Sequence, residues 1–166
     1  MSDTTPAQQP ENGAQPDNAA LFSLEKVYIK DFSVENPNAP DSFLEQAPPQ
    51  IEVQLMNQAK NVAEGIFESV LTATVTARLG DKVIFLVEVA QAGVFQVRNI
   101  PEEIMNPLIG IQCPTILFPY LREAVSDAIQ RAGYTPVYLS PINFEAWYAE
   151  QQQREQAQGE GTTSAA

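Results

Sequence analysis

IFESVLTATVTARL, residues 66–79, is followed by Gly80 and Asp81 and then by KVIFLVEVAQAGVFQV, residues 82–97. In the first stretch, apolar residues from Leu71 to Leu79 alternate with threonines, which is typical of a strand with one buried face. A glycine and an aspartate between two such stretches predict a two-residue hairpin turn. The sequence therefore predicts an antiparallel hairpin over residues 66–97.

The second strand of this hairpin is apolar on both faces. One face carries Val83, Phe85, Val87 and Val89, and the other carries Ile84, Leu86 and Glu88. A small isolated sheet does not need two apolar faces, so we expect helices to cover one face. The other face is then covered by a partner or is itself a binding surface.

Two more strands are predicted before the hairpin. Over residues 22–35, Phe32 and Val34 alternate with Asp31, Ser33 and Glu35, and over residues 51–58 one face carries Ile51, Val53 and Leu55. Prolines at positions 37, 40, 48 and 49 lie between these strands and break the pairing, because proline has no backbone donor.

Helices are predicted in the C-terminal half. Residues 114–131 have apolar residues at helical spacing, Gly133 suits the C-terminal cap, and Pro119 predicts a later start or a kink. A shorter helix is predicted from Asn143 to about Gln153. Strands followed by helices predict the α+β class: a four-stranded antiparallel sheet with a long and a short C-terminal helix on one face.

Composition limits the organisation of the chain. Residues 1–20 are polar and acidic and residues 151–166 are rich in Gln, Gly and Thr, so we expect a disordered tail at each end of a domain over residues 21–150. The first 18 residues contain no Lys, Arg or apolar run, which argues against a signal peptide. No apolar run approaches the roughly 18 residues of a membrane span.

Charge and residue types exclude several classes of function. The 21 acidic residues outnumber the 9 basic ones, so the chain should repel nucleic acids and anionic lipids and attract basic polypeptides. The chain has no His and a single cysteine, Cys113, which leaves no metal cluster, no disulfide and no histidine base. We expect Cys113 to be structural, no metal or cofactor, and a reducing cytoplasm.

Two residue groups are candidates for binding. The aromatic residues Phe43, Phe144, Trp147 and Tyr148 either fill a core, as aromatics at helical spacing usually do, or line an adaptable apolar groove beside the proline-rich connection. The residues Asp31, Glu35, Leu86 and Glu88 lie on strand faces that are either simply solvated or form an acidic docking patch.

Three motifs carry a resemblance to a known family. The stretches YIKDFSVENPNAP (28–40), CPTILFPY (113–120) and PINF (141–144) resemble the first strand and turn, the long helix and the last helix of SecB protein-export chaperones. The resemblance extends in order over about residues 22–150. It departs at Ala47, because family members often have a Trp before the proline that opens the second strand.

The resemblance implies an ATP-independent, cofactor-free cytoplasmic chaperone. It would hold unfolded precursor proteins in an export-competent state and deliver them to the SecA motor ATPase. The implied groove for these client chains consists of Phe43, Ile51, Val53, Leu55, Phe144, Trp147 and Tyr148. The implied docking face for SecA consists of Asp31, Glu35, Leu86 and Glu88.

The resemblance also implies a homotetramer, built as a dimer of dimers. The apolar strand face and the stripe of the long helix exceed what one small domain can bury, so we expect an oligomer interface at Val87, Val89, Leu117 and Leu121. Two alternatives remain at this point: a SecB-like chaperone that serves another partner, such as one linked to an antitoxin, and a cofactor-free enzyme that uses carboxylates and tyrosine.

Overall fold

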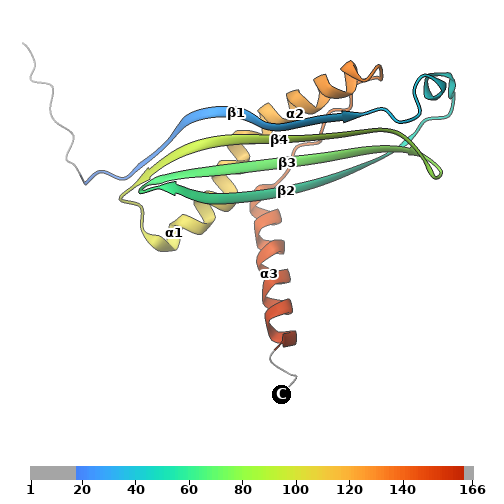
Figure 1. Ribbon diagram of the computed structural model, residues 1–166. Helices are drawn as coiled ribbons and strands as arrows, with labels where there is room; N and C mark the ends of the chain where they lie inside the picture. Colours follow the sequence, from blue (N-terminus) through green and yellow to red (C-terminus); the bar gives the residue numbers. More distant parts are fainter. Residues whose placement is uncertain (1–17, 163–166) are drawn as a thin grey trace, which may run out of the picture.

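The structure, a computed structural model, describes residues 18–162, with side chains up to residue 157. Its sheet consists of β1 (Leu21–Glu35), β2 (Gln50–Ala63), β3 (Ile66–Leu79) and β4 (Lys82–Arg98). All neighbouring strands are antiparallel, in the order β1-β4-β3-β2, so that β1 and β2 are the edges. Figure 1 shows the long helix lying along one face of this sheet.

Glycines at positive φ close both hairpins. Gly80 has a φ of +56° and lets Leu79 pair with Lys82, which confirms the predicted turn. Gly65, between β2 and β3, has a φ of +68°, and a Cβ there would stand 2.9 Å from the Val97 carbonyl oxygen. Strand β2 therefore continues to Ala63, beyond the predicted end at Gln58. Its last residues, 59–63, are exposed and do not alternate between apolar and polar types, so they lack the pattern that marks a strand.

The helical layer is continuous over residues 102–131. It begins with α1 (Glu102–Pro107), passes through the π-helical turn η2 (Leu108–Gln112) and continues as α2 (Cys113–Arg131). Helix α2 packs on β3 and β4, and we call the sheet face that it covers the inner face. Pro119 lies inside α2 on its exposed side, where water can bond the carbonyl that proline leaves free.

This helix also meets the length and composition of a membrane span, contrary to the expectation from the sequence. Its mean hydropathy reaches 1.2 over an 18-residue window, and 28% of that window is buried. In α2, the apolar residues that face the sheet form the core with the inner faces of β3 and β4. On the remaining surface of the continuous helix, the apolar side chains of Ile104 in α1 and Tyr120 in α2 stay about half exposed.

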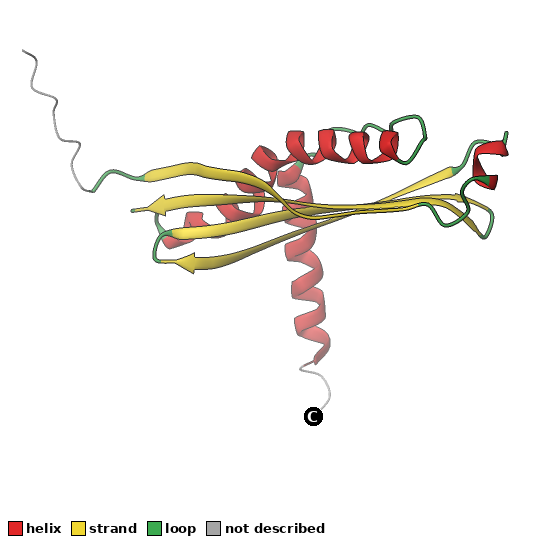
Figure 2. Cartoon of the chain, turned by 45° about the horizontal axis from the view of Figure 1, so that its top comes forward, coloured by secondary structure: helices red, strands yellow, loops and turns green. Residues whose placement is uncertain are grey.

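A left-handed glycine ends α2 in a Schellman motif. Gly133 has a φ of +94°; its N–H donates to the Gln130 carbonyl, and the Tyr134 N–H donates to the Ile129 carbonyl. The predicted C-terminal cap is therefore confirmed. Beyond it the chain turns back alongside α2 and leads to the last helix (Figure 2).

The structure corrects the four residues expected at an oligomer interface. Val87, Val89, Leu117 and Leu121 each have 0% exposure within one chain, because they form the core between α2 and the sheet. Val87 pairs with Val75, and Val89 with Ala73, all on the inner face. A strand that is apolar on both faces does not show which face the helices cover, and the expectation chose the face that is the core.

The last helix, α3 (Phe144–Thr162), is longer than predicted and projects away from the sheet (Figure 1). Asn143 caps it, since its side-chain oxygen accepts from the Ala146 N–H at 3.0 Å. The helix end predicted near Gln153 is wrong, because α3 continues to Thr162 and so includes part of the segment expected as a tail. Gln, Glu and Arg have good helix propensity, and Glu150 lies one turn before Arg154. The predicted N-terminal tail lies largely outside the described residues.

Candidate functional site

An apolar strip follows the inner face of the edge strand β2. Ile51 pairs with Ala77, Val53 with Val75 and Leu55 with Ala73, so all three side chains point toward the helical layer. Helix α2 packs on β3 and β4 and leaves β2 uncovered. Ile51 and Val53 are therefore 40% and 43% exposed, and Leu55 is half-buried. The strip is apolar surface without a cover inside this chain.

The segment that follows α2 forms the opposite wall of this strip. Residues 137–142 and the side chains of Val53 and Leu55 enclose a cavity of about 340 Å³. Leu139 is anchored in the core at 4% exposure, whereas Tyr138 is 64% exposed. The result is a cleft with apolar walls, one from a strand and one from an irregular segment.

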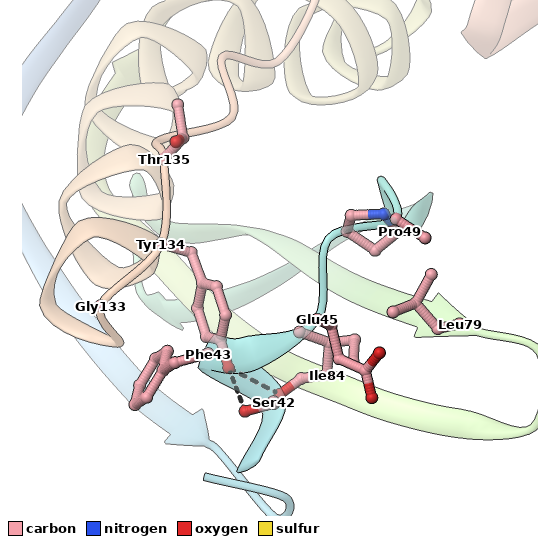
Figure 3. Close-up of a pocket in the computed structure, with 10 residues that line it drawn as sticks. Ser42, Phe43, Glu45, Pro49, Leu79, Ile84, Gly133, Tyr134 and Thr135 are labelled. Carbon is pink, nitrogen blue, oxygen red and sulfur yellow. Dashed lines mark hydrogen bonds between the residues drawn. The ribbon is translucent and has the colours of Figure 1, made fainter. Parts of the chain in front are cut away.

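Two further cavities continue the cleft along β2. Toward its start, a pocket of about 410 Å³ is lined by Phe43, Pro49, Leu79 and Tyr134 among others (Figure 3). Further along the strand, a pocket of about 240 Å³ lies between Leu55, Met56 and the helix residues Trp147 and Tyr148. From residue 49 to residue 57 a strand rises about 27 Å, which matches an extended segment of about eight residues.

Tyr134 holds the first pocket together (Figure 3). Its hydroxyl lies 2.7 Å from the Ser42 hydroxyl and donates to the Asn36 side-chain oxygen at 3.0 Å. Its ring lies between Phe43 and Phe85, with centroids 5.2 Å and 5.0 Å away. The short 3₁₀ helix η1 (Asp41–Leu44) is thereby fixed to the end of α2, and Phe43 lies against Gly133.

The outer face of the sheet brings together the four residues of the expected docking patch. Glu35 pairs with Leu86 and Ser33 with Glu88 across β1 and β4, and Asp31 pairs with Ala90 in the next position of the same face. Asp31 and Glu35 are exposed, while Leu86 and Glu88 are half-exposed beside them. The Glu88 carboxylate accepts a hydrogen bond from Thr74 at 2.9 Å. This half of the outer face is acidic around one leucine.

A second cluster on the outer face surrounds Glu68 of β3. This residue is 5% exposed and accepts hydrogen bonds from Lys30 and from the Tyr28 hydroxyl, while Lys60 lies 3.1 Å away. The hydrogen bond from Lys30, followed by that from Tyr28, lowers the pKa of Glu68 to about 2. The same bond to Glu68 raises the pKa of Tyr28 to about 12. Glu68 is thus ionised and paired at neutral pH.

Comparison with known proteins decides the family. Residues 15–155 match the family described as "Preprotein translocase subunit SecB". A protein-export protein SecB of Methylobacillus flagellatus is 49% identical over 93% of this chain and 98% of its own length. A protein of the same name from an Azoarcus species is 57% identical over 84% of this chain and 90% of its own length.

The chain belongs to the SecB family. Its fold is also found in a solved SecB-like chaperone of Mycobacterium tuberculosis, which was determined in complex with a peptide from an antitoxin. That chain matches with a TM-score of 0.61 and 14% identity over 73% of this chain and 90% of its own length. The fold prediction for this SecB chain is therefore confirmed by both the family and the observed sheet and helices.

Six of the seven groove residues predicted for this SecB chain lie at the cleft, and the seventh lies in the core. Phe43, Ile51, Val53, Leu55, Trp147 and Tyr148 contribute to the surface of the cleft or to its pockets, with Ile51 on the same exposed strip. Phe144 does not, because it is 4% exposed in the core and its ring packs edge-on against Phe118 and Trp147. It supports the cleft from below instead of lining it.

Sequence reasoning missed the wall made by residues 134–142 in this SecB chain. The stretch between Gly133 and Pro141 has no strand or helix period, so its pattern predicts no regular element. Its apolar residues, Tyr134, Val137, Tyr138 and Leu139, were the available signal, because a connection that only meets water does not need four of them. Gly110 was also missed; the Tyr148 ring lies directly on it, where any side chain would collide.

The part of this SecB chain that the structure describes holds neither a metal cluster nor a reactive thiol. Among the described residues, no group of three or more His, Cys, Asp or Glu side chains could hold a metal ion. Burial raises the pKa of Cys113 to about 12, so the thiol stays protonated and unreactive at neutral pH. This agrees with the structural role that was expected for Cys113.

Proposed function

We propose that this SecB chain holds unfolded precursor proteins by laying extended apolar segments into the cleft along β2, and keeps them competent for export. The observation that carries the proposal is the uncovered strip of Ile51, Val53 and Leu55 facing residues 137–142. Folded proteins bury such side chains, so a cleft of this kind selects chains that expose them. Many weak contacts over several copies would add avidity.

The free edge of β2 supports the same role. An edge strand presents unpaired backbone N–H and C=O groups, which an extended client can bond in addition to placing side chains in the pockets. The net charge of −12 favours encounters with basic client segments. None of these contacts needs an energy source, and the cytoplasm is the proposed compartment because precursors are met there before export.

We further propose that the acidic half of the outer face docks the SecA motor ATPase. Leu86 offers apolar burial, while Asp31, Glu35 and Glu88 offer steering and orientation for a basic partner segment. The export role is preferred to an antitoxin-linked one because the relatives named for protein export are 49% and 57% identical, and the antitoxin-peptide chaperone only 14%. The enzyme alternative gains no support from Glu68, whose pKa is shifted down, away from the range of a general base.

The proposed assembly is a tetramer, with an interface that differs from the residues first expected. The inner side of edge strand β1 leaves Ile29, Phe32 and Val34 between 37% and 44% exposed, next to a free strand edge. On the helical layer, Ile104 and Tyr120 are about half exposed. We assign the first set to pairing of two copies and the second to stacking of two dimers.

Val53→Asp tests the client proposal. The substitution places a charge on the apolar strip and should weaken binding of an unfolded, basic polypeptide about tenfold, because the charge is desolvated when the client docks. Gln54→Asp is the matched control, since it adds the same charge one residue away on the outer face. Binding is read from the fluorescence of Trp147 and from native mass spectrometry. Equal affinities for the two variants would place the client elsewhere.

A further inference from the structure

The outer face of the sheet is divided into an acidic half and a basic half. Following the register across the four strands, one half carries Asp31, Glu35, Glu52 and Glu88, with Arg78 at its far end. The other half carries Lys26, Lys30 and Lys60, with Glu68 among them. The two halves meet at the neighbouring residues Lys30 and Asp31, so a cation of the basic half lies next to a carboxylate of the docking face.

Lys30 nevertheless points away from Asp31. The register of β1 shifts between Ile29 and Asp31, which puts the Lys30 side chain on the outer face as well. Its ammonium group lies 2.8 Å from both oxygens of Glu68, two strands away. Strand β4 lies between them, and its outer-face residues nearest to Lys30 in the register, Ala90 and Ala92, are small and buried, at 8% and 0% exposure.

The docking carboxylates are correspondingly unpaired. Among the residues whose side chains the structure describes, no ion pair includes Asp31, Glu35 or Glu88. Two of the face's three lysines, Lys30 and Lys60, are bound to Glu68 instead. A lysine with a flexible stem pairs with whichever carboxylate it can reach, so the position of Glu68 decides which carboxylates remain available.

We propose that Glu68 is a positioning residue of the SecA docking face, which holds Lys30 so that the Asp31 carboxylate stays free for a basic segment of the motor. The proposal rests on the docking role argued above. Glu68 does not contact the motor; it acts through Lys30. Without it, the released ammonium group pairs with Asp31 and competes with the partner's own cations for the acidic half.

Glu68→Gln is the variant that tests this role. It keeps the size of the side chain and an oxygen that can accept from Tyr28, but it releases Lys30 and Lys60. Of these two lysines only Lys30 lies next to Asp31 in the chain. We expect SecA to bind about three- to fivefold more weakly, which is the range for one exposed ion pair formed in competition. The salt dependence of binding should also become shallower, because one fewer free carboxylate takes part. Glu64→Gln is the control: it removes the same charge from the exposed β2–β3 turn.

A second substitution distinguishes a positioning role of Glu68 from damage to the fold. Adding Lys30→Met to Glu68→Gln removes the released cation and keeps the stem, so binding of SecA should return to the value of the Glu64→Gln control. Binding of the unfolded polypeptide should be equal in all these variants. The measurement is isothermal titration of the purified chaperone with SecA and, separately, with the client.

Three results would overturn the proposal. Glu68→Gln could bind SecA as well as Glu64→Gln does, the double variant could stay weak, or client binding could fall together with SecA binding. Asp31→Asn is measured in parallel to distinguish the two proposals. If Asp31→Asn binds SecA normally, the docking face itself is misplaced; if it binds weakly while Glu68→Gln binds normally, only the role of Glu68 fails.

Discussion

The hydroxyl of Tyr134 offers a sharp test of how the cleft is held open. Tyr134→Phe keeps the ring contacts with Phe43 and Phe85 but removes the oxygen that lies 2.7 Å from the Ser42 hydroxyl. Ser42 is 4% exposed, so water does not readily replace the lost partner. The loss of the hydrogen bonds to Ser42 and Asn36, together with the orphaned Ser42 hydroxyl, should lower the free energy of unfolding by about 2 kcal/mol.

The measurement is urea unfolding followed by circular dichroism, at one protein concentration because assembly and stability are linked. Tyr138→Phe is the matched control, since Tyr138 is 64% exposed and should change stability by less than about 0.5 kcal/mol. Adding Ser42→Ala to Tyr134→Phe removes the orphaned group and should recover about half of the loss. A Tyr134→Phe variant as stable as Tyr138→Phe would refute this account of the loop.

Two other predictions follow from exposed and buried groups on β1 and β3. Phe32→Asp should dissociate the tetramer at micromolar concentration in native mass spectrometry, because a charge at the contact between two copies is left unpaired. Ser33→Asp is the control on the outer face and should leave the tetramer intact. Equal masses for the two variants would contradict the assigned interface. The pKa of Glu68 is depressed, so its stabilisation is present above its ordinary pKa of about 4.5 and is lost as the pH falls through about 2. Glu68→Gln should therefore lower the free energy of unfolding by roughly 2 kcal/mol at pH 7 and by much less near pH 2; a difference independent of pH would contradict the pairing.

Much of the sheet could be predicted from the sequence because alternation is a local property. The alternation puts Asp31 and Glu35 on one face of β1, and Leu86 and Glu88 on one face of β4. The antiparallel register then brings both pairs onto the same face of the sheet. Alternation does not say which face the helices cover. Val87 and Val89 belong to the covered face, so their assignment to an oligomer interface failed although their mutual parity was right.

The cleft was less predictable because its walls come from segments far apart in the chain. Val53 and Leu55 could be read from their alternation, but residues 137–142 have no period and meet the strip only through the turn at Gly133. Phe144 illustrates the same limit: helical spacing identified it as apolar, whereas only the packing against Phe118 shows that it is buried. Side chains of one type at one spacing can fill a core or line a cleft.

The two small residues of β4 nearest to Lys30 in the register, Ala90 and Ala92, have a consequence for how this surface can change. A larger side chain at Ala90 or Ala92 would separate Lys30 from Glu68 without altering a single charge. The electrostatic pattern shown to a partner therefore depends on the size of two uncharged residues as much as on the ionised ones. Among relatives, substitutions at positions 90 and 92 should accompany changes at 30 and 68, and a comparison of charged residues alone would misread which surfaces are equivalent.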